Sequence, residues 1–344
     1  MSNPYQSDND ALHFLSTQGW LPLILGDHPS FVEAYTNLLA ASATFFALDE
    51  SSPQKTTYRA VTGALASEEG YSKIPAEKLI LTIKTSSHCP SPLLSRVQEA
   101  WSLTGAFMSQ LCTEIAESLQ LSPNVFAPLI DPCITLPAGE RTPTLLRMFR
   151  YDRPSGPDWK VNAEKHRDLG LLSLVVGHSP GLHVLNSSTG LWVPIEEDDV
   201  LPPDARIRSG GLTATLLVGE TLAFLSRGKF KAGVHGVVCA PLPSEGGEMG
   251  GGAIKVESEQ YRYSIVFTLR PAIAPLWTKD FESEITGWFP EGMRSEGTSS
   301  DELFTSIREA HYNVNVAPEV REKQRLAQVR QQQKGMGKRA QGQG

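Results

Sequence analysis

A long stretch between about residues 144 and 271 has the sequence pattern of β-structure. Short apolar runs follow one another there, separated by glycine, proline, aspartate and serine. Short strands divided by turn residues are typical of an all-β sandwich or barrel. Since a chain of 344 residues can bury a large core, we expect this stretch to form the central β-domain.

Segments on either side of this stretch have helical patterns. The run 31–48 begins directly after Ser30, which forms a capping-box signature with Glu33, and apolar residues recur at helical spacing along 91–119. Short apolar runs predict strands near residues 20–25 and 79–84. The polar segment 49–74 predicts a loop. We expect further helices over 123–130 and 301–312. The divisions are a helical N-terminal region (1–135), the β-core with a C-terminal helix (136–316) and a basic tail (317–344), which we expect to be disordered or a frayed helix.

The tripeptide from His166 to Asp168 is the first candidate for chemistry. It precedes an apolar run, and in a strand the side chains of residues two apart point to the same side. An imidazole and a carboxylate would then project together from one sheet face. The pattern also occurs by chance, so it predicts a metal site only if a third ligand joins it.

His235 lies in a second apolar run and is the candidate third ligand. Two histidines and one carboxylate on one side of a metal suit non-haem Fe(II), because coordination positions stay open for substrate and O2. The alternative is that His235 is a hydrogen-bonded core residue.

The segment 261–271 predicts a strand on which Arg262 and Ser264 share a face. An inward-facing arginine is costly unless it meets an anion. Its planar fork fits a carboxylate, and a hydroxyl two residues on adds a hydrogen bond. A structural ion pair on an outward face is the alternative.

The order of these motifs resembles the isopenicillin-N-synthase-like branch of the Fe(II)/2-oxoglutarate-dependent dioxygenases. The resemblance includes the strand at His166, the hairpin patterns at 181–185 and 191–195, the stretch 217–235 and the strand 262–271. It is close over about 140–271 and loose over the first 130 residues. Glu220, Gly236 and the Asp152 that follows Tyr151 depart from the family pattern.

The resemblance implies a mainly β fold with flanking helices, a cupin-like jelly-roll double-stranded β-helix. It implies Fe(II) as cofactor, with 2-oxoglutarate as cosubstrate and O2. The cosubstrate would be decarboxylated to succinate and CO2 while a small organic molecule, as in secondary metabolism, is hydroxylated or desaturated. The far carboxylate of 2-oxoglutarate would bind Arg262 and Ser264, and Tyr151 would add a hydrogen bond. By strand parity Thr268 and Phe149 are candidates for the substrate pocket.

Two other functions remain open. A relative that uses iron and O2 without 2-oxoglutarate would keep the same Arg262 and Ser264. The other hypothesis is a non-catalytic binding module on this fold, although the intact set of three candidate ligands argues against it.

Composition limits the partners and the compartment. The net charge is −7, and basic residues are concentrated after residue 317, so the rest of the chain is more acidic still. An acidic body argues against nucleic acid as the main partner. The four cysteines are scattered, which favours free thiols in a reducing, cytoplasmic compartment. No run of apolar residues is long enough to cross a membrane. We therefore expect a small-molecule substrate and no membrane partner, and the sequence leaves the oligomeric state undefined.

Two connections are long for the family, 196–211 and the glycine-rich 241–252. The second lacks the lysine and hydroxyl residue of a phosphate-binding loop. We interpret it as a surface loop, and the role of a mobile lid or partner contact is the minor alternative.

Overall fold

Two antiparallel sheets form the core of the computed structural model, which describes residues 8–60, 69–201, 207, 209–241 and 260–328. The larger sheet has seven strands in the order β1 (Trp20–Leu23), β9 (Thr213–Val218), β6 (Leu172–Gly177), β11 (Tyr261–Leu269), β4 (Leu145–Asp152), β3 (Lys78–Ile83) and β2 (Gly70–Ile74). The smaller sheet has the order β5 (Lys160–His166), β10 (His235–Cys239), β7 (Leu182–Leu185) and β8 (Trp192–Pro194). A separate pair joins β12 (Pro275–Trp277) to β13 (Glu296–Ser299).

The two sheets pack face to face, and the side-chain alternation of each strand decides what lies between them. Along β11, Tyr263, Ile265 and Phe267 point into the core that the helices cover. Val266 points the other way, into a second core shared with Val237 of the smaller sheet. Arg262 and Ser264 have the parity of Val266, so they face the space between the sheets, as predicted.

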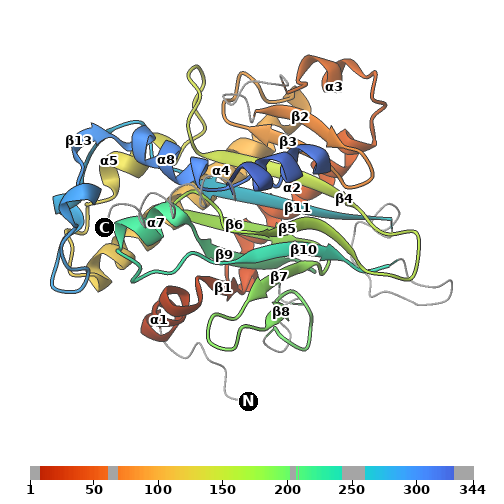
Figure 1. The fold of residues 1–344 in the computed structure, drawn as a ribbon. Helices are drawn as coiled ribbons and strands as arrows, with labels where there is room; N and C mark the ends of the chain where they lie inside the picture. The colour runs from red at the N-terminus through yellow and green to blue at the C-terminus, as the bar shows by residue number, and fades with distance from the viewer. Residues whose placement is uncertain (1–7, 61–68, 202–206, 208, 242–259, 329–344) are drawn as a thin grey trace.

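Helices cover the outer face of the larger sheet (Figure 1). The ring of Trp101 meets that of Phe267 at 5.1 Å, and its indole nitrogen donates to the Cys133 carbonyl at 3.1 Å. An aromatic pair of this kind adds about 0.5–1.5 kcal/mol to the burial of both rings. The helices are α1 (Asp8–Gln18), α2 (Pro29–Ala47), α3 (Pro53–Thr57), α4 (Ser91–Ser118), α5 (Ala127–Ile130), α7 (Glu220–Leu225) and α8 (Ser300–Glu309), with 3-10 turns η1 (Leu25–Asp27), η2 (Asp131–Cys133), η3 (Thr278–Phe281) and η4 (Glu291–Met293).

The described helices include none with the combined length and apolar character that crossing a bilayer requires.

The N-terminal region contains strands as well as helices, and β1 and β3 coincide with the strands predicted near 20–25 and 79–84. It supplies β1, β2 and β3, which lie at the two edges of the larger sheet. The expected loop 49–74 contains α3 and β2. Tertiary contacts stabilise both: Lys55 donates to the carbonyls of Phe46 and Leu48 at the end of α2, and Tyr71 donates to Glu50.

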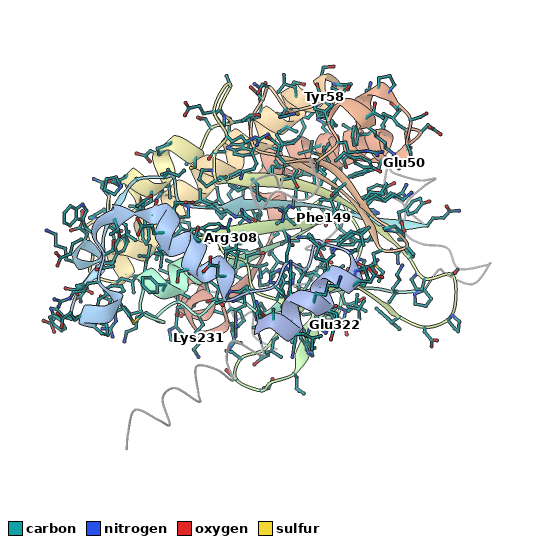
Figure 2. All side chains as sticks on the ribbon, turned by 45° about the horizontal axis from the view of Figure 1, so that its top comes forward. Glu50, Tyr58, Phe149, Lys231, Arg308 and Glu322 are labelled. Carbon is teal, nitrogen blue, oxygen red and sulfur yellow. The ribbon has the colours of Figure 1, made fainter. Side chains whose placement is uncertain are left out.

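The C-terminal tail begins with a helix, which is one of the two expected forms. Residues 318–328 form a helix, whereas 329–344 lie outside the described residues. Figure 2 labels Glu322 on this helix. Arg321 is buried and pairs with Glu77 and Glu164, and Arg325 also pairs with Glu164. These carboxylates belong to distant parts of the chain, so the local sequence does not reveal the pairing.

Candidate metal and oxo-acid site

His166 and His235 lie on neighbouring strands of the smaller sheet. His166 is the last residue of β5, His235 is the first of β10, and the two are direct partners in the antiparallel register. Their ring centroids are 4.2 Å apart. The two imidazoles that the sequence predicts as ligands therefore lie side by side at one end of the sheet.

Asp168 joins them by a different route from the one predicted. β5 ends at His166, so Asp168 follows the strand instead of sharing a face within it. The backbone there is fixed by α7, because the amide of Glu220 donates to the Asp168 carbonyl at 2.8 Å. One carboxylate oxygen of Asp168 lies 4.0 Å from the Nε2 of each histidine.

The orientation of both imidazoles suits metal binding through Nε2. His166 Nδ1 lies 2.8 Å from the Glu164 carbonyl, and His235 Nδ1 lies 3.1 Å from the Gly233 carbonyl. A carbonyl accepts, so each Nδ1 carries the proton and each Nε2 offers a lone pair. One ligand atom from each of the three residues lies within 4.8 Å of the others.

Electrostatics keep His166 and Asp168 in the protonation states that a metal needs. Burial and the neighbouring His235 hold the pKa of His166 well below its ordinary value, so this imidazole is neutral at pH 7. Burial alone would raise the pKa of Asp168, but its electrostatic interaction with the two histidines outweighs this effect, so the pKa lies below its ordinary value. A neutral imidazole beside a carboxylate suits a divalent ion with open positions, which fits Fe(II).

Arg262 and Ser264 are buried between the sheets. Within the described chain, Arg262 Nη1 and Ser264 Oγ have no hydrogen bond of standard geometry. Two buried donors of this kind fit a carboxylate, which would satisfy both. Burial raises the pKa of the neighbouring Tyr151, and its ring lies 5.4 Å from the Arg262 guanidinium carbon.

Glu196 is a residue of this site that the sequence reading missed. Both of its carboxylate oxygens accept from Arg262 Nη2, at 3.1 and 2.9 Å, and both residues are almost fully buried. Glu196 also accepts from the Leu182 amide at 2.7 Å and from the Thr213 hydroxyl at 3.0 Å. Arg262 was expected to meet a ligand alone, whereas in the structure it already has an internal partner.

The two predicted pocket residues both face the space between the sheets. Phe149 is buried and stacks on Tyr151 with ring centroids 5.2 Å apart. Thr268 is buried and accepts from the Ser173 hydroxyl at 3.1 Å. Ser173 also helps to lower the pKa of Asp168, so Thr268 lies near the candidate metal ligands.

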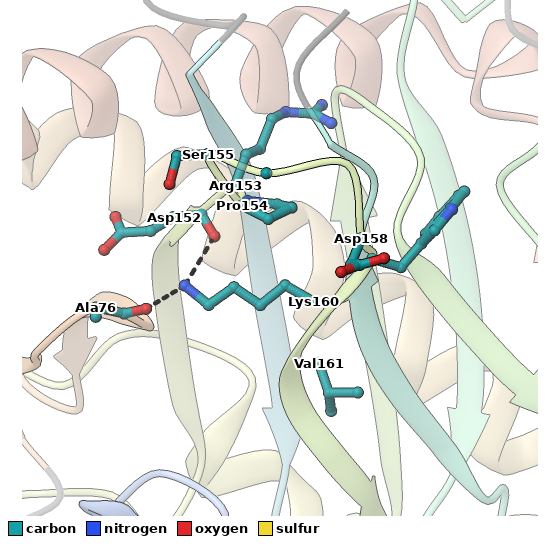
Figure 3. A pocket seen from close by; sticks show the side chains of 10 residues that line it. Ala76, Asp152, Arg153, Pro154, Ser155, Asp158, Lys160 and Val161 are labelled. Carbon is teal, nitrogen blue, oxygen red and sulfur yellow. Dashed lines mark hydrogen bonds between the residues drawn. The ribbon is translucent and has the colours of Figure 1, made fainter.

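A surface hollow of about 680 Å³ lies at the other end of β5 from His166 (Figure 3). Its lining includes Arg153, Trp159 and Lys160. Lys160 donates to the carbonyls of Ala76 and Asp152, the contacts drawn as dashed lines. The hollow is therefore separate from the three candidate metal ligands.

Comparison with known sequences gives partial matches. No family model matches the chain. The oxidoreductase vrtI of Penicillium aethiopicum is 29% identical over 170 residues, which are 49% of this chain and 32% of that protein. The 2-oxoglutarate-dependent dioxygenase frbH of Dothideomycetidae sp. is 33% identical over 99 residues, 29% of this chain and 27% of that protein. The chain thus matches about a third or less of the length of these relatives.

Solved structures match over most of the chain. A full-length protein of Neurospora crassa, crystallised in complex with alpha-KG, has a TM-score of 0.60 at 22% identity, and the match covers 86% of this chain and 88% of that one. A 2OG-Fe(II) oxygenase family protein of Caulobacter crescentus has a TM-score of 0.60 at 20% identity, covering 88% and 93%. The predicted double-stranded β-helix with flanking helices is confirmed, and the chain has the fold of the Fe(II)/2-oxoglutarate oxygenases that its motifs resemble.

Proposed function

We propose that this protein is a non-haem Fe(II)/2-oxoglutarate-dependent oxygenase that hydroxylates or desaturates a small organic molecule. The observation that carries the proposal is the convergence of His166, Asp168 and His235, whose ligand atoms lie within 4.8 Å of one another. The fold and the partial matches to an oxidoreductase and a 2-oxoglutarate-dependent dioxygenase support it. All four cysteines are buried free thiols, which supports a reducing compartment such as the cytoplasm.

Each part of the site has a role in this proposal. His166, Asp168 and His235 would hold Fe(II), which supplies the activation of O2 when it is bound. Arg262 Nη1 and Ser264 Oγ would donate to the far carboxylate of 2-oxoglutarate. The apolar side chains of the second core, between the two sheets, would exclude water from the oxo acid.

Turnover tests the proposal. The purified protein is incubated in air with Fe(II), 2-oxoglutarate and a panel of metabolites. We expect succinate in amounts that match a product carrying one more oxygen or two fewer hydrogens. Asp168→Ala should form neither product, whereas Asp199→Asn, on the exposed part of the 196–201 segment, should behave as the wild type.

One observation favours a second function. Arg262 is already paired with Glu196, as it would be in an iron and O2 oxidase that has no oxo-acid cosubstrate. Oxidation of a metabolite that needs Fe(II) and O2 but is unaffected by 2-oxoglutarate would identify that activity. Failure to bind Fe(II) under anaerobic conditions would instead favour a non-catalytic binding module.

A further inference from the structure

The Arg262 guanidinium is divided between an internal partner and an unused edge. Nη2 donates to both carboxylate oxygens of Glu196, and Nε donates to the Ser179 carbonyl at 3.1 Å. Nη1 alone lacks a partner among the residues that the structure describes. Glu196 and Ser179 therefore fix the plane of the guanidinium and leave one nitrogen for a ligand.

Two glycines make room for this ion pair. A Cβ atom on Gly177 would lie 2.8 Å from Glu196 Oε1 and 3.0 Å from Arg262 Nη2. A Cβ atom on Gly181 would lie 2.6 Å from both Cδ and Nε of Arg262. A side chain at either position would displace the ion pair. The backbone of both glycines therefore leaves the space that Arg262 and Glu196 occupy.

A second arginine stands beside the pair. Arg153 donates to the Ser179 hydroxyl at 3.3 Å and to the Ala240 carbonyl at 3.4 Å, so it shares Ser179 with Arg262. Burial and the nearby charge of Arg262 lower its pKa. Figure 3 shows the guanidinium turned away from the Asp152 carboxylate, and among the described residues no carboxylate pairs with it.

The charges in this group do not cancel. Among the described side chains of this group, Arg262 and Arg153 against Glu196 leave one positive charge. Burial lowers the pKa of the adjacent His178 to about 4 and that of the half-buried His183, so both imidazoles are neutral at pH 7. Burial raises the pKa of the Cys239 thiol, which stays protonated.

The oxo-acid subsite therefore depends on the second arginine. The pair of Arg262 and Glu196 is neutral by itself, and a carboxylate placed against Nη1 would be a buried charge without compensation, which is costly. Arg153 restores the positive charge that such a carboxylate requires.

We propose that Glu196 and Arg153 are specificity-determining residues of the oxo-acid subsite: Glu196 fixes and partly neutralises Arg262, and Arg153 supplies the charge that balances the far carboxylate of the cosubstrate. This inference rests on the proposed function. It predicts the direction in which each Kd changes. Removing the charge of Glu196 should strengthen the binding of a dianionic oxo acid, and removing that of Arg153 should weaken it.

Calorimetric titration of protein loaded with Mn(II), a redox-inert substitute for Fe(II), tests this. The proteins are the wild type, Glu196→Gln, Arg153→Gln, the double variant and Arg153→Lys. Gln fits at position 196, since its oxygen can accept from Leu182 and Arg262 while its amide donates to the Thr213 hydroxyl. The ligands are 2-oxoglutarate and 2-oxobutyrate, which lacks the far carboxylate.

We expect Glu196→Gln to lower the Kd for 2-oxoglutarate by about tenfold and Arg153→Gln to raise it by about tenfold, the size expected when one charge beside the subsite is removed. The double variant and Arg153→Lys should stay within about threefold of the wild type. The Kd for 2-oxobutyrate should change in none of them, because this ligand has no group to contact the subsite.

Matched controls are Asp199→Asn and Arg96→Gln, which remove the same charges from exposed positions and should leave both Kd values unchanged. Changes of the same sign in the two single variants, or equal changes for both ligands, would overturn the inference. A wild type that binds Mn(II) but not 2-oxoglutarate would instead refute the proposed function, so the two failures are distinguishable.

Discussion

Replacing Arg262 by leucine should damage the fold as well as the binding of the oxo acid. Arg262 is fully buried and Glu196 is 1% exposed, so the substitution leaves a carboxylate in the core without its guanidinium. Breaking a buried ion pair in this way costs about 3–5 kcal/mol. A second substitution, Glu196→Gln, removes the buried negative charge and leaves only imperfect hydrogen bonds, which cost about 1–3 kcal/mol.

Urea unfolding of the four proteins in this cycle measures the coupling. The wild type, Arg262→Leu, Glu196→Gln and the double variant should give a coupling energy of at least about 2 kcal/mol, with the double variant more stable than Arg262→Leu. The double variant should nevertheless fail to bind 2-oxoglutarate, because Nη1 is gone. If Arg262→Leu loses under about 1 kcal/mol, or if Glu196→Gln does not relieve the loss, the buried pair is not the interaction described.

Three further predictions concern the metal ligands, a buried lysine and the glycine beside the ion pair. Asp168→Ala and His235→Ala should abolish turnover and metal binding while circular dichroism stays that of the wild type; wild-type rates would mean that the ligands are others. Burial lowers the pKa of Lys78 from 10.5 to about 7, so the unfolded chain binds more protons between these values and stability rises with pH. Relative to Lys78→Met, the wild type should gain about 2 kcal/mol in urea unfolding between pH 7 and pH 9, and an equal pH dependence in both proteins would contradict this. Gly177→Ala should destabilise by about 1–3 kcal/mol and weaken binding of 2-oxoglutarate, and a variant with wild-type urea midpoint and Kd would show that the space is not needed.

The sequence predicts that the three candidate ligands meet, but it does not predict how the chain brings them together. His166, Asp168 and His235 do converge, but Asp168 does so through the turn after β5 and not through strand alternation. The inward face of Arg262 and Ser264 follows from alternation alone, because β11 is a long regular strand with one face against each core.

Glu196 could not be predicted in the same way. It opens an acidic run that looks like a solvated connection, and the burial that distinguishes it arises from Leu182 and Thr213 on other strands. The short strand β2 was missed, and the helix 318–328 was expected only as a frayed helix or a disordered tail. Long-range contacts stabilise both elements, that of Tyr71 with Glu50 and that of Arg321 with Glu77. The long helices α2 and α4 were predictable because their apolar spacing is local.

Anaerobic titration with Fe(II) followed by 2-oxoglutarate tests the central claim most directly. An oxo acid that chelates Fe(II) through its carboxylate and keto oxygens gives a visible charge-transfer absorption. We predict that this band appears at one equivalent of each for the wild type and is absent for His235→Ala. Wild-type protein that binds Fe(II) without developing the band, or a variant that develops it fully, would contradict the assignment of the site.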